Sequence, residues 1–169
     1  MLDRTQLAAT EARVAARIRE ELCNLDRVVA LVDEALASHP VKPPPSVVVT
    51  HGVGGLLHDF YTGVENVFGQ VSPHLNGEMP AGETWHAELL HSMALDLAGV
   101  RPPVISGASE RSLAEYLRFR HVYRHMYGFR LDWARVRQLA AGVRPLWGGV
   151  RAEIDGFVAF LDEVVRRAT

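Results

Sequence analysis

The chain has 169 residues, 48% of them apolar, a net charge of −2 and one cysteine. This length predicts a single domain over residues 1–169, and the composition excludes an intramolecular disulfide and an apolar run of roughly 18 or more residues, so no membrane partner is expected. The N-terminal residues carry charges from Asp3 onward and lack the apolar segment of a signal peptide. The sequence therefore predicts a cytoplasmic protein.

The charge is distributed unevenly along the chain. Residues 111–151 contain nine arginines and two acids, a net charge of +7, which leaves −9 for the remainder. Local positive charge inside a mildly acidic protein favours a confined anion site. A compositional explanation stands beside it, because seventeen arginines against one lysine are also what a codon-biased genome produces.

Residues 3–38 are predicted to form one long N-terminal helix, which ends before the proline-rich segment 39–45. Its apolar residues recur at spacings of four and three, the seam of a helix that packs along its length. These residues are Ile18, Leu22, Leu25, Val29, Val32 and Leu36.

A second helix is expected over residues 46–72. Its apolar seam consists of Leu57, Phe60, Val64, Val67 and Val71. The glycines near its start are interpreted as points of close helix contact or of a local kink. His58, Tyr61 and Glu65 share a polar face, which either lines a site or, as is more common, is simply a solvated edge.

The second half of the chain predicts further helices. One is expected over 83–97 and another over 109–127, the latter capped by Ser109 and ending at Gly128. A short helix over 132–138 and a last one over 145–167, with Pro145 in its first turn, complete the chain. The fold class is therefore all-α, an antiparallel helical bundle of four long helices plus a short one.

The most unusual stretch runs over residues 120–127 and reads Arg-His-Val-Tyr-Arg-His-Met-Tyr. At about 100° per residue, Phe119, Val122 and Met126 share one apolar stripe. Four side chains that can be cationic are predicted on the opposite half of the helix: Arg120, His121, Arg124 and His125. Such a face either meets an anion or is simply solvated.

A metal site at this face is disfavoured. His121 and His125 are four residues apart and form a usable ligand pair, but Val122 stands where the zinc-protease pattern requires Glu. The interleaved arginines also repel a cation. Neither a metal nor another cofactor is predicted.

Phosphodiester chemistry fits the stretch better, because histidine acts as acid or base near neutral pH and arginine offers phosphate a planar fork. Arg120 and His125 diverge by roughly 140° around the helix axis, so one copy aims them poorly at a single phosphate. Two copies across a two-fold axis would bring both around one cleft. The geometry thus predicts a homodimer with a composite site.

Arg120, His125 and Tyr127 match the Arg-x4-His-x-Tyr motif of the HepT toxins, which belong to the HEPN superfamily of helical ribonucleases. The segments His58 to Tyr61 with Glu65, Trp85-His86, and Arg118 to Phe129 also resemble a HepT-like family. The resemblance covers roughly residues 50–165.

The resemblance implies a metal-independent endoribonuclease toxin whose dimer cleft holds the catalytic Arg120 and His125 of both subunits. Arg124, His121 and Arg118 are second-rank candidates for contacts with the RNA substrate. The implied partner is a nucleotidyltransferase antitoxin of the MntA type, which adenylylates Tyr127 and blocks the toxin. The alternative is a noncatalytic HEPN module that presents a nucleotide or a partner to a nucleotidyltransferase.

Overall fold

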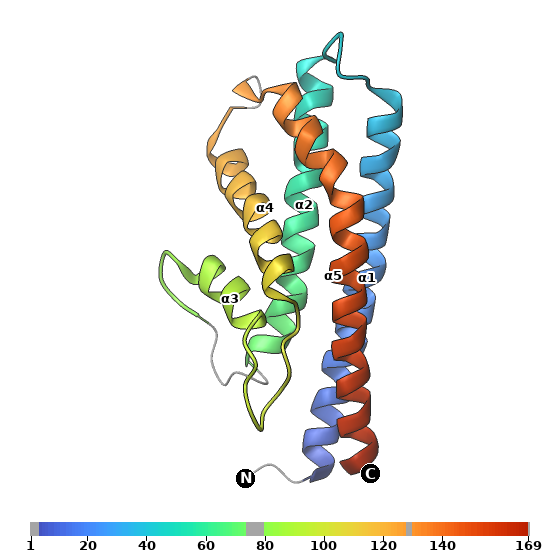
Figure 1. Ribbon diagram of the computed structural model, residues 1–169, viewed down its shortest axis with the longest axis vertical. Helices are drawn as coiled ribbons and strands as arrows, with labels where there is room; N and C mark the ends of the chain where they lie inside the picture. Colours follow the sequence, from blue (N-terminus) through green and yellow to red (C-terminus); the bar gives the residue numbers. More distant parts are fainter. Residues whose placement is uncertain (1–3, 74–79, 128–129, 169) are drawn as a thin grey trace.

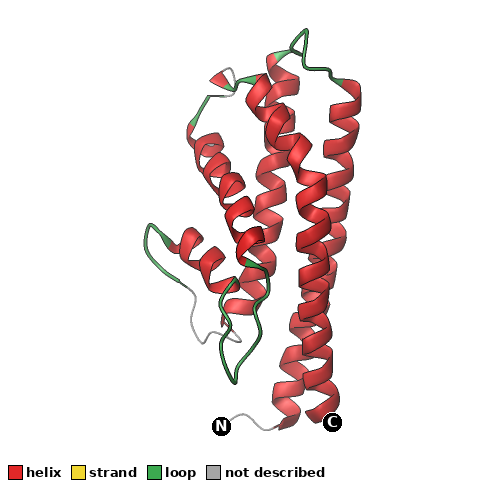
Figure 2. Ribbon diagram, in the orientation of Figure 1, coloured by secondary structure: helices red, strands yellow, loops and turns green. Residues whose placement is uncertain are grey.

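The structure, a computed structural model, describes residues 4–73, 80–127 and 130–168. Within these ranges the chain forms five helices and no strand, which confirms the predicted all-α bundle (Figures 1 and 2). The helices are α1 (Arg4–Ser38), α2 (Val47–Val71), α3 (Trp85–Met93), α4 (Gly107–His125) and α5 (Trp133–Ala168). None of the helices described has a stretch long and apolar enough to cross a bilayer.

The two longest helices, α1 and α5, run antiparallel beside each other, so that the two chain ends lie at the same end of the bundle (Figure 1). The seam predicted for α1 is buried from Ile18 through Val32. Polar contacts also join the helices: the Trp147 indole N–H donates to Asp26 at 2.7 Å, and Arg151 forms an ion pair with the same carboxylate at 3.3 Å. The N-terminal helix is thus part of the hydrophobic core.

Helix α2 is the central element, packed against each of the other four helices. Its glycines allow close approach, as predicted from the sequence. A Cβ atom at Gly54 would lie 2.9 Å from the ring of Tyr123 on α4, and one at Gly63 would lie 2.7 Å from Leu25 on α1. Both distances are shorter than van der Waals contact, so the helices pack this closely because these positions carry no side chain.

The predicted break between a short helix over 132–138 and a last helix from Pro145 is wrong. Helix α5 is continuous, with Pro145 inside it. A proline in a helix interior removes one hydrogen bond and crowds the preceding turn. Buried residues on both sides, including Val143 and Trp147, hold the chain helical across this position. The first turns of α5 lean toward α4 before the helix runs along α1 (Figure 1).

Two other predicted boundaries are corrected. Helix α3 ends at Met93, where the buried Arg101 guanidinium donates to the carbonyl oxygen of Ser92 in the last turn and to that of Leu95 just beyond the helix. Helix α4 is capped by Ser106, whose hydroxyl accepts from the Ser109 N–H at 3.2 Å, and not by Ser109 itself. The predicted terminator of α4, Gly128, lies outside the described residues.

We predict that Gly63→Ala destabilises the protein. The added methyl group overlaps Leu25, and overpacking in a core typically costs more than the roughly 1 kcal/mol that alanine contributes to helix stability. Urea unfolding should show a net loss of about 1 kcal/mol. The matched control is Gly69→Ala on the same helix, where an added Cβ meets nothing within 4 Å. This control should be neutral or stabilising; equal losses at both positions would contradict the packing argument.

Candidate functional site

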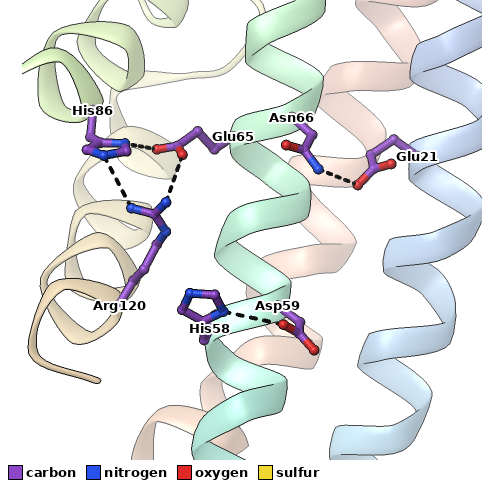
Figure 3. A network of polar contacts seen from close by, with 7 residues as sticks. All are labelled: Glu21, His58, Asp59, Glu65, Asn66, His86 and Arg120. Carbon is purple, nitrogen blue, oxygen red and sulfur yellow. Dashed lines mark hydrogen bonds and ion pairs between the residues drawn. The ribbon is translucent and has the colours of Figure 1, made fainter. Parts of the chain in front are cut away.

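Arg120 lies in a buried polar cluster that joins three helices, α2, α3 and α4 (Figure 3). Its Nη2 atom is 3.3 Å from Oε1 of Glu65, and its Nη1 atom is 3.4 Å from Nε2 of His86. The other carboxylate oxygen of Glu65 lies 2.5 Å from Nδ1 of His86. We call these three residues the Arg120 cluster. Arg120 and Glu65 are each only 8% exposed.

The cluster has a consistent direction of hydrogen bonding. Glu65 as a carboxylate is an acceptor only, so the Nδ1–H of His86 donates to it. The imidazole in this tautomer leaves a lone pair on Nε2, which accepts from Arg120 Nη1. In the Arg120 cluster the carboxylate and the guanidinium therefore pair directly, and the His86 ring bridges them with one hydrogen bond to each.

Tyr61 of α2 lies near the Arg120 cluster, within electrostatic range of Glu65 and Arg120. Its side chain is fully buried, and its hydroxyl makes no hydrogen bond within the described residues. The pKa of this phenol is raised, mainly by burial and further by the negative charge of Glu65, while Arg120 acts in the opposite direction. The Nε atom of Arg120 is also buried without a partner. Two polar atoms with unused hydrogen-bonding capacity thus lie in this part of the site.

The local sequence explains how the cluster is held. Glu65 lies on α2 between buried Val64 and Val67, so its carboxylate enters the bundle interior. His86 follows Trp85 at the start of α3, and the two rings lie 3.5 Å apart between centroids. The predicted solvated edge on α2 is therefore wrong, since Tyr61 and Glu65 are both buried.

The face of α4 is oriented differently from the prediction. Arg120 is buried toward α2 and α3, whereas His121, Arg124 and His125 are exposed, so the four side chains do not form one solvent-facing group. The apolar stripe predicted on α4 also differs from the buried side of the helix. Phe119 is buried as predicted, but Val122 is 43% exposed.

Tyr123 takes the place of Val122 on the inner side of α4. Its ring stacks on His51 at 5.1 Å, and its hydroxyl lies 3.2 Å from Nε2 of the same histidine. The space for this ring comes from Gly54 on α2. Close packing of α4 against α2 at this point brings Arg120 within reach of Glu65 one turn earlier along α4.

The remaining predicted residues lie near the exposed end of α4. The rings of His121 and His125 are 4.9 Å apart. Helix α4 ends at His125, and Met126 has an extended backbone, so Tyr127 does not continue the helix. The predicted end of this helix at residue 127 is therefore wrong, and Tyr127 lies beyond the helix. Its side chain is 72% exposed.

Arg118 is separated from the Arg120 cluster and lines a groove of about 370 Å³ between α4 and the start of α5. The apolar residues of the groove are Phe119, Val122, Met126, Leu131, Val136 and Leu139. Arg130 and Arg135 line the same groove. The arginine-rich segment thus divides into one buried guanidinium in the cluster and several on the outer surface.

Arg120 and His125 are not brought together in a single copy. Among the described residues, no hydrogen bond, ion pair or ring contact joins them. The same part of the chain holds no group of three His, Cys, Asp or Glu side chains arranged to bind a metal ion. The chemistry available to one copy is therefore a well-anchored guanidinium and a separate, solvent-accessible imidazole pair.

Comparison with known protein families identifies the family of this chain. A family model described as HepT-like protein matches residues 52–161, more than half of the chain. The chain belongs to the HepT-like family. This confirms the resemblance drawn from Arg120, His125 and Tyr127, and all three lie within the matched region. No curated protein and no solved structure matches the chain in the corresponding comparisons.

Sequence reasoning on this HepT-like protein did not assign a role to Glu65 or His86. A signal was present for Glu65, since it lies between Val64 and Val67 of the predicted apolar seam, and a carboxylate needs a partner if it is buried. Nothing in the sequence identified that partner, because His86 and Arg120 are 21 and 55 residues further along the chain. Only the packing of α3 and α4 on α2 brings the three together.

The cluster predicts that Arg120 is structurally important and His125 is not. Arg120→Ala leaves Glu65 buried without its cation and should lower the free energy of unfolding by about 3 kcal/mol. His125→Ala removes an exposed side chain and should change it by less than about 0.5 kcal/mol. Urea titrations followed by circular dichroism measure both values. Similar losses for the two variants would contradict the burial of Arg120.

Proposed function

We propose that this HepT-like protein is a metal-independent endoribonuclease toxin that cleaves RNA in the cytoplasm at a composite site in a homodimer. The observation that carries the proposal is the Arg120 guanidinium, anchored on the same helix that ends at the exposed His125. These are the two residue types that phosphodiester cleavage without a metal requires.

The proposed reaction is an internal transfer at an RNA phosphate. His125 removes the proton of the 2′-hydroxyl, and the 2′-oxygen forms a bond to phosphorus. The bond from phosphorus to the 5′-oxygen breaks, and that oxygen takes a proton from the protonated His125 of the second copy. The products are a 2′,3′-cyclic phosphate and a 5′-hydroxyl. Arg120 stabilises the negative charge that develops on the phosphate oxygens.

The need for two copies follows from the directions of the two side chains. Arg120 faces α2 and α3, while His125 faces solvent at the helix end. A two-fold axis near the exposed face of α4 would bring a histidine from one copy toward the guanidinium of the other. His121, Arg124 and Arg118 are exposed around this face and are available for contacts with the RNA backbone.

Tyr127 is the proposed control point. Its exposed ring lies two residues beyond the end of α4, which suits modification by an MntA-type nucleotidyltransferase antitoxin. Addition of AMP to the hydroxyl would place a phosphate and a nucleoside next to the face meant for RNA. The nuclease would then be blocked by charge and by volume without unfolding.

The cleavage prediction rests on His125. His125→Ala should lower RNA cleavage by roughly two orders of magnitude or more while leaving the fold intact. Products analysed by mass spectrometry should end in 2′,3′-cyclic phosphate, and EDTA should have no effect on the rate. His91→Ala, which removes an exposed histidine of α3, is the matched control and should keep full activity.

Light scattering tests the composite site in the same preparation, with an expected mass about twice 18.7 kDa. A monomer that cleaves RNA at the full rate would overturn the dimeric arrangement. Loss of all cleavage when EDTA is added would show that the reaction depends on a metal ion.

The modification prediction rests on Tyr127. Incubation with ATP, magnesium and the cognate nucleotidyltransferase should raise the mass of the protein in steps of one AMP, and RNA cleavage should fall in parallel. Tyr127→Phe removes the acceptor hydroxyl and should resist both changes. If the variant is modified and silenced as readily as the parent, the control point lies elsewhere.

One observation favours the alternative, a noncatalytic HEPN module that works with a nucleotidyltransferase. Both Nη atoms of Arg120 already have partners within the bundle, as expected for a purely structural arginine. Such a module would bind the nucleotidyltransferase and show no cleavage, with or without modification. The cleavage assay therefore decides between the two functions.

A further inference from the structure

We propose that Glu65 and His86 are positioning residues that hold the Arg120 guanidinium in the orientation in which it binds the RNA phosphate. The inference rests on the proposed function and adds two residues to it. Neither residue belongs to the Arg-x4-His-x-Tyr motif, and neither is expected to touch the substrate. Their action is exerted through Arg120 alone.

The Arg120 cluster uses only part of the hydrogen-bonding capacity of the guanidinium. A guanidinium has five N–H donors in one plane. Nη2 forms the ion pair with Glu65, and Nη1 donates to His86, while the Nε–H is buried without a partner. Each Nη atom keeps a second N–H. These two N–H groups, held in a fixed plane, remain for an anion. Holding the plane in advance removes the rotational freedom that a long arginine side chain otherwise loses on binding phosphate.

The contacts of Glu65 also require an acceptor on both sides of the carboxylate. Both oxygens of Glu65 face a donor group: Oε1 forms the ion pair with Arg120, and Oε2 accepts from His86. An amide at this position supplies one acceptor and one donor. Whichever way the amide turns, a donor then faces either Arg120 or the Nδ1–H of His86. If the ring changes tautomer to relieve the second clash, its Nε2–H faces the guanidinium instead.

Two other histidine–carboxylate pairs in the protein differ from the Arg120 cluster. His58 with Asp59 on α2, and His91 with Glu110 between α3 and α4, have contacts of 3.3 and 2.9 Å. Glu110 is 26% exposed and Asp59 is 63% exposed, against 9% for the side chain of Glu65. Within the described residues, no hydrogen bond or ion pair joins either of these pairs to an arginine. The Arg120 cluster is thus distinct in burial and in its cation.

Four variants separate positioning from packing, with Arg120 intact in all of them. Glu65→Gln keeps the side-chain shape but reverses one hydrogen bond. His86→Phe keeps a ring against Trp85 but removes both hydrogen bonds, whereas His86→Gln keeps one donor and one acceptor. Glu110→Gln, which weakens a different contact between α3 and α4, is the matched control.

We expect Glu65→Gln and His86→Phe to lower kcat for RNA cleavage by about 10-fold or more, because the clamp on the transition state is misaligned. His86→Gln should keep kcat within about threefold of the parent, and Glu110→Gln should leave it unchanged. The circular dichroism spectra should be the same for all four. If His86→Gln is as impaired as His86→Phe, or Glu65→Gln is as active as Glu110→Gln, the positioning role is wrong.

A second experiment does not depend on nuclease activity. In Arg120→Ala, Glu65 and His86 remain as an empty cradle for a guanidinium group. Millimolar guanidinium chloride, compared with sodium chloride, should raise the Tm of this variant and should not do so in the double variant Arg120→Ala with Glu65→Gln. Equal Tm shifts in the two proteins, or none in either, would show that Glu65 and His86 do not form a binding site for a guanidinium group. If Arg120→Ala shows no cooperative transition even with guanidinium, the cradle is likewise rejected.

The two experiments also separate the inference from the proposed function. Absence of RNA cleavage by the parent protein would reject the ribonuclease, while guanidinium binding by Arg120→Ala would still show that Glu65 and His86 orient this group. Cleavage by the parent together with unaltered kcat in Glu65→Gln would reject the positioning role and leave the ribonuclease standing.

Discussion

The burial of Glu65 is the constraint on which the site depends. Helix α2 packs against all four other helices, and a carboxylate in such a helix is stable only if cationic and hydrogen-bonding partners reach it. Arg120 and His86 fill that need, and in doing so they tie α4 and α3 to the central helix. The position of the guanidinium is therefore a consequence of how the bundle is packed, and α4 cannot rotate without breaking the cluster.

The long N-terminal helix contributes to this arrangement indirectly. The HepT-like match begins at residue 52, so α1 lies outside it, yet α1 packs against both α2 and α5. Leu25 meets the bare backbone of Gly63 only two residues before Glu65. The contact sets the depth of α2 in the bundle, and with it the depth of the carboxylate. A segment with little family signal thus supports the part that carries the motif.

The separation of Arg120 from His125 suits the roles proposed for these two residues. One is held in the interior by two partners, and the other stands at a helix end in solvent. Rigid placement suits a group that stabilises charge, since reorientation at the moment of reaction is avoided. Access to solvent suits a group that exchanges protons with substrate. In the proposed site the two requirements are met on one helix, because five residues span about 1.4 turns and so point the side chains roughly 140° apart.

Much of this protein was determined by the sequence alone. Periodic apolar residues predicted α1 and α2, and the motif at Arg120, His125 and Tyr127 predicted the family, because both signals are local. The relative directions of Arg120 and His125 also followed from helical spacing.

The absolute orientation of α4 was decided only by the tertiary structure, since spacing says how side chains diverge but not which one faces the core. The burial of Arg120, the partnership with Glu65 and His86, and the continuity of α5 through Pro145 all depend on contacts between distant segments. Local patterns contain no information about which buried charge will find which partner, because that choice is made when the helices pack.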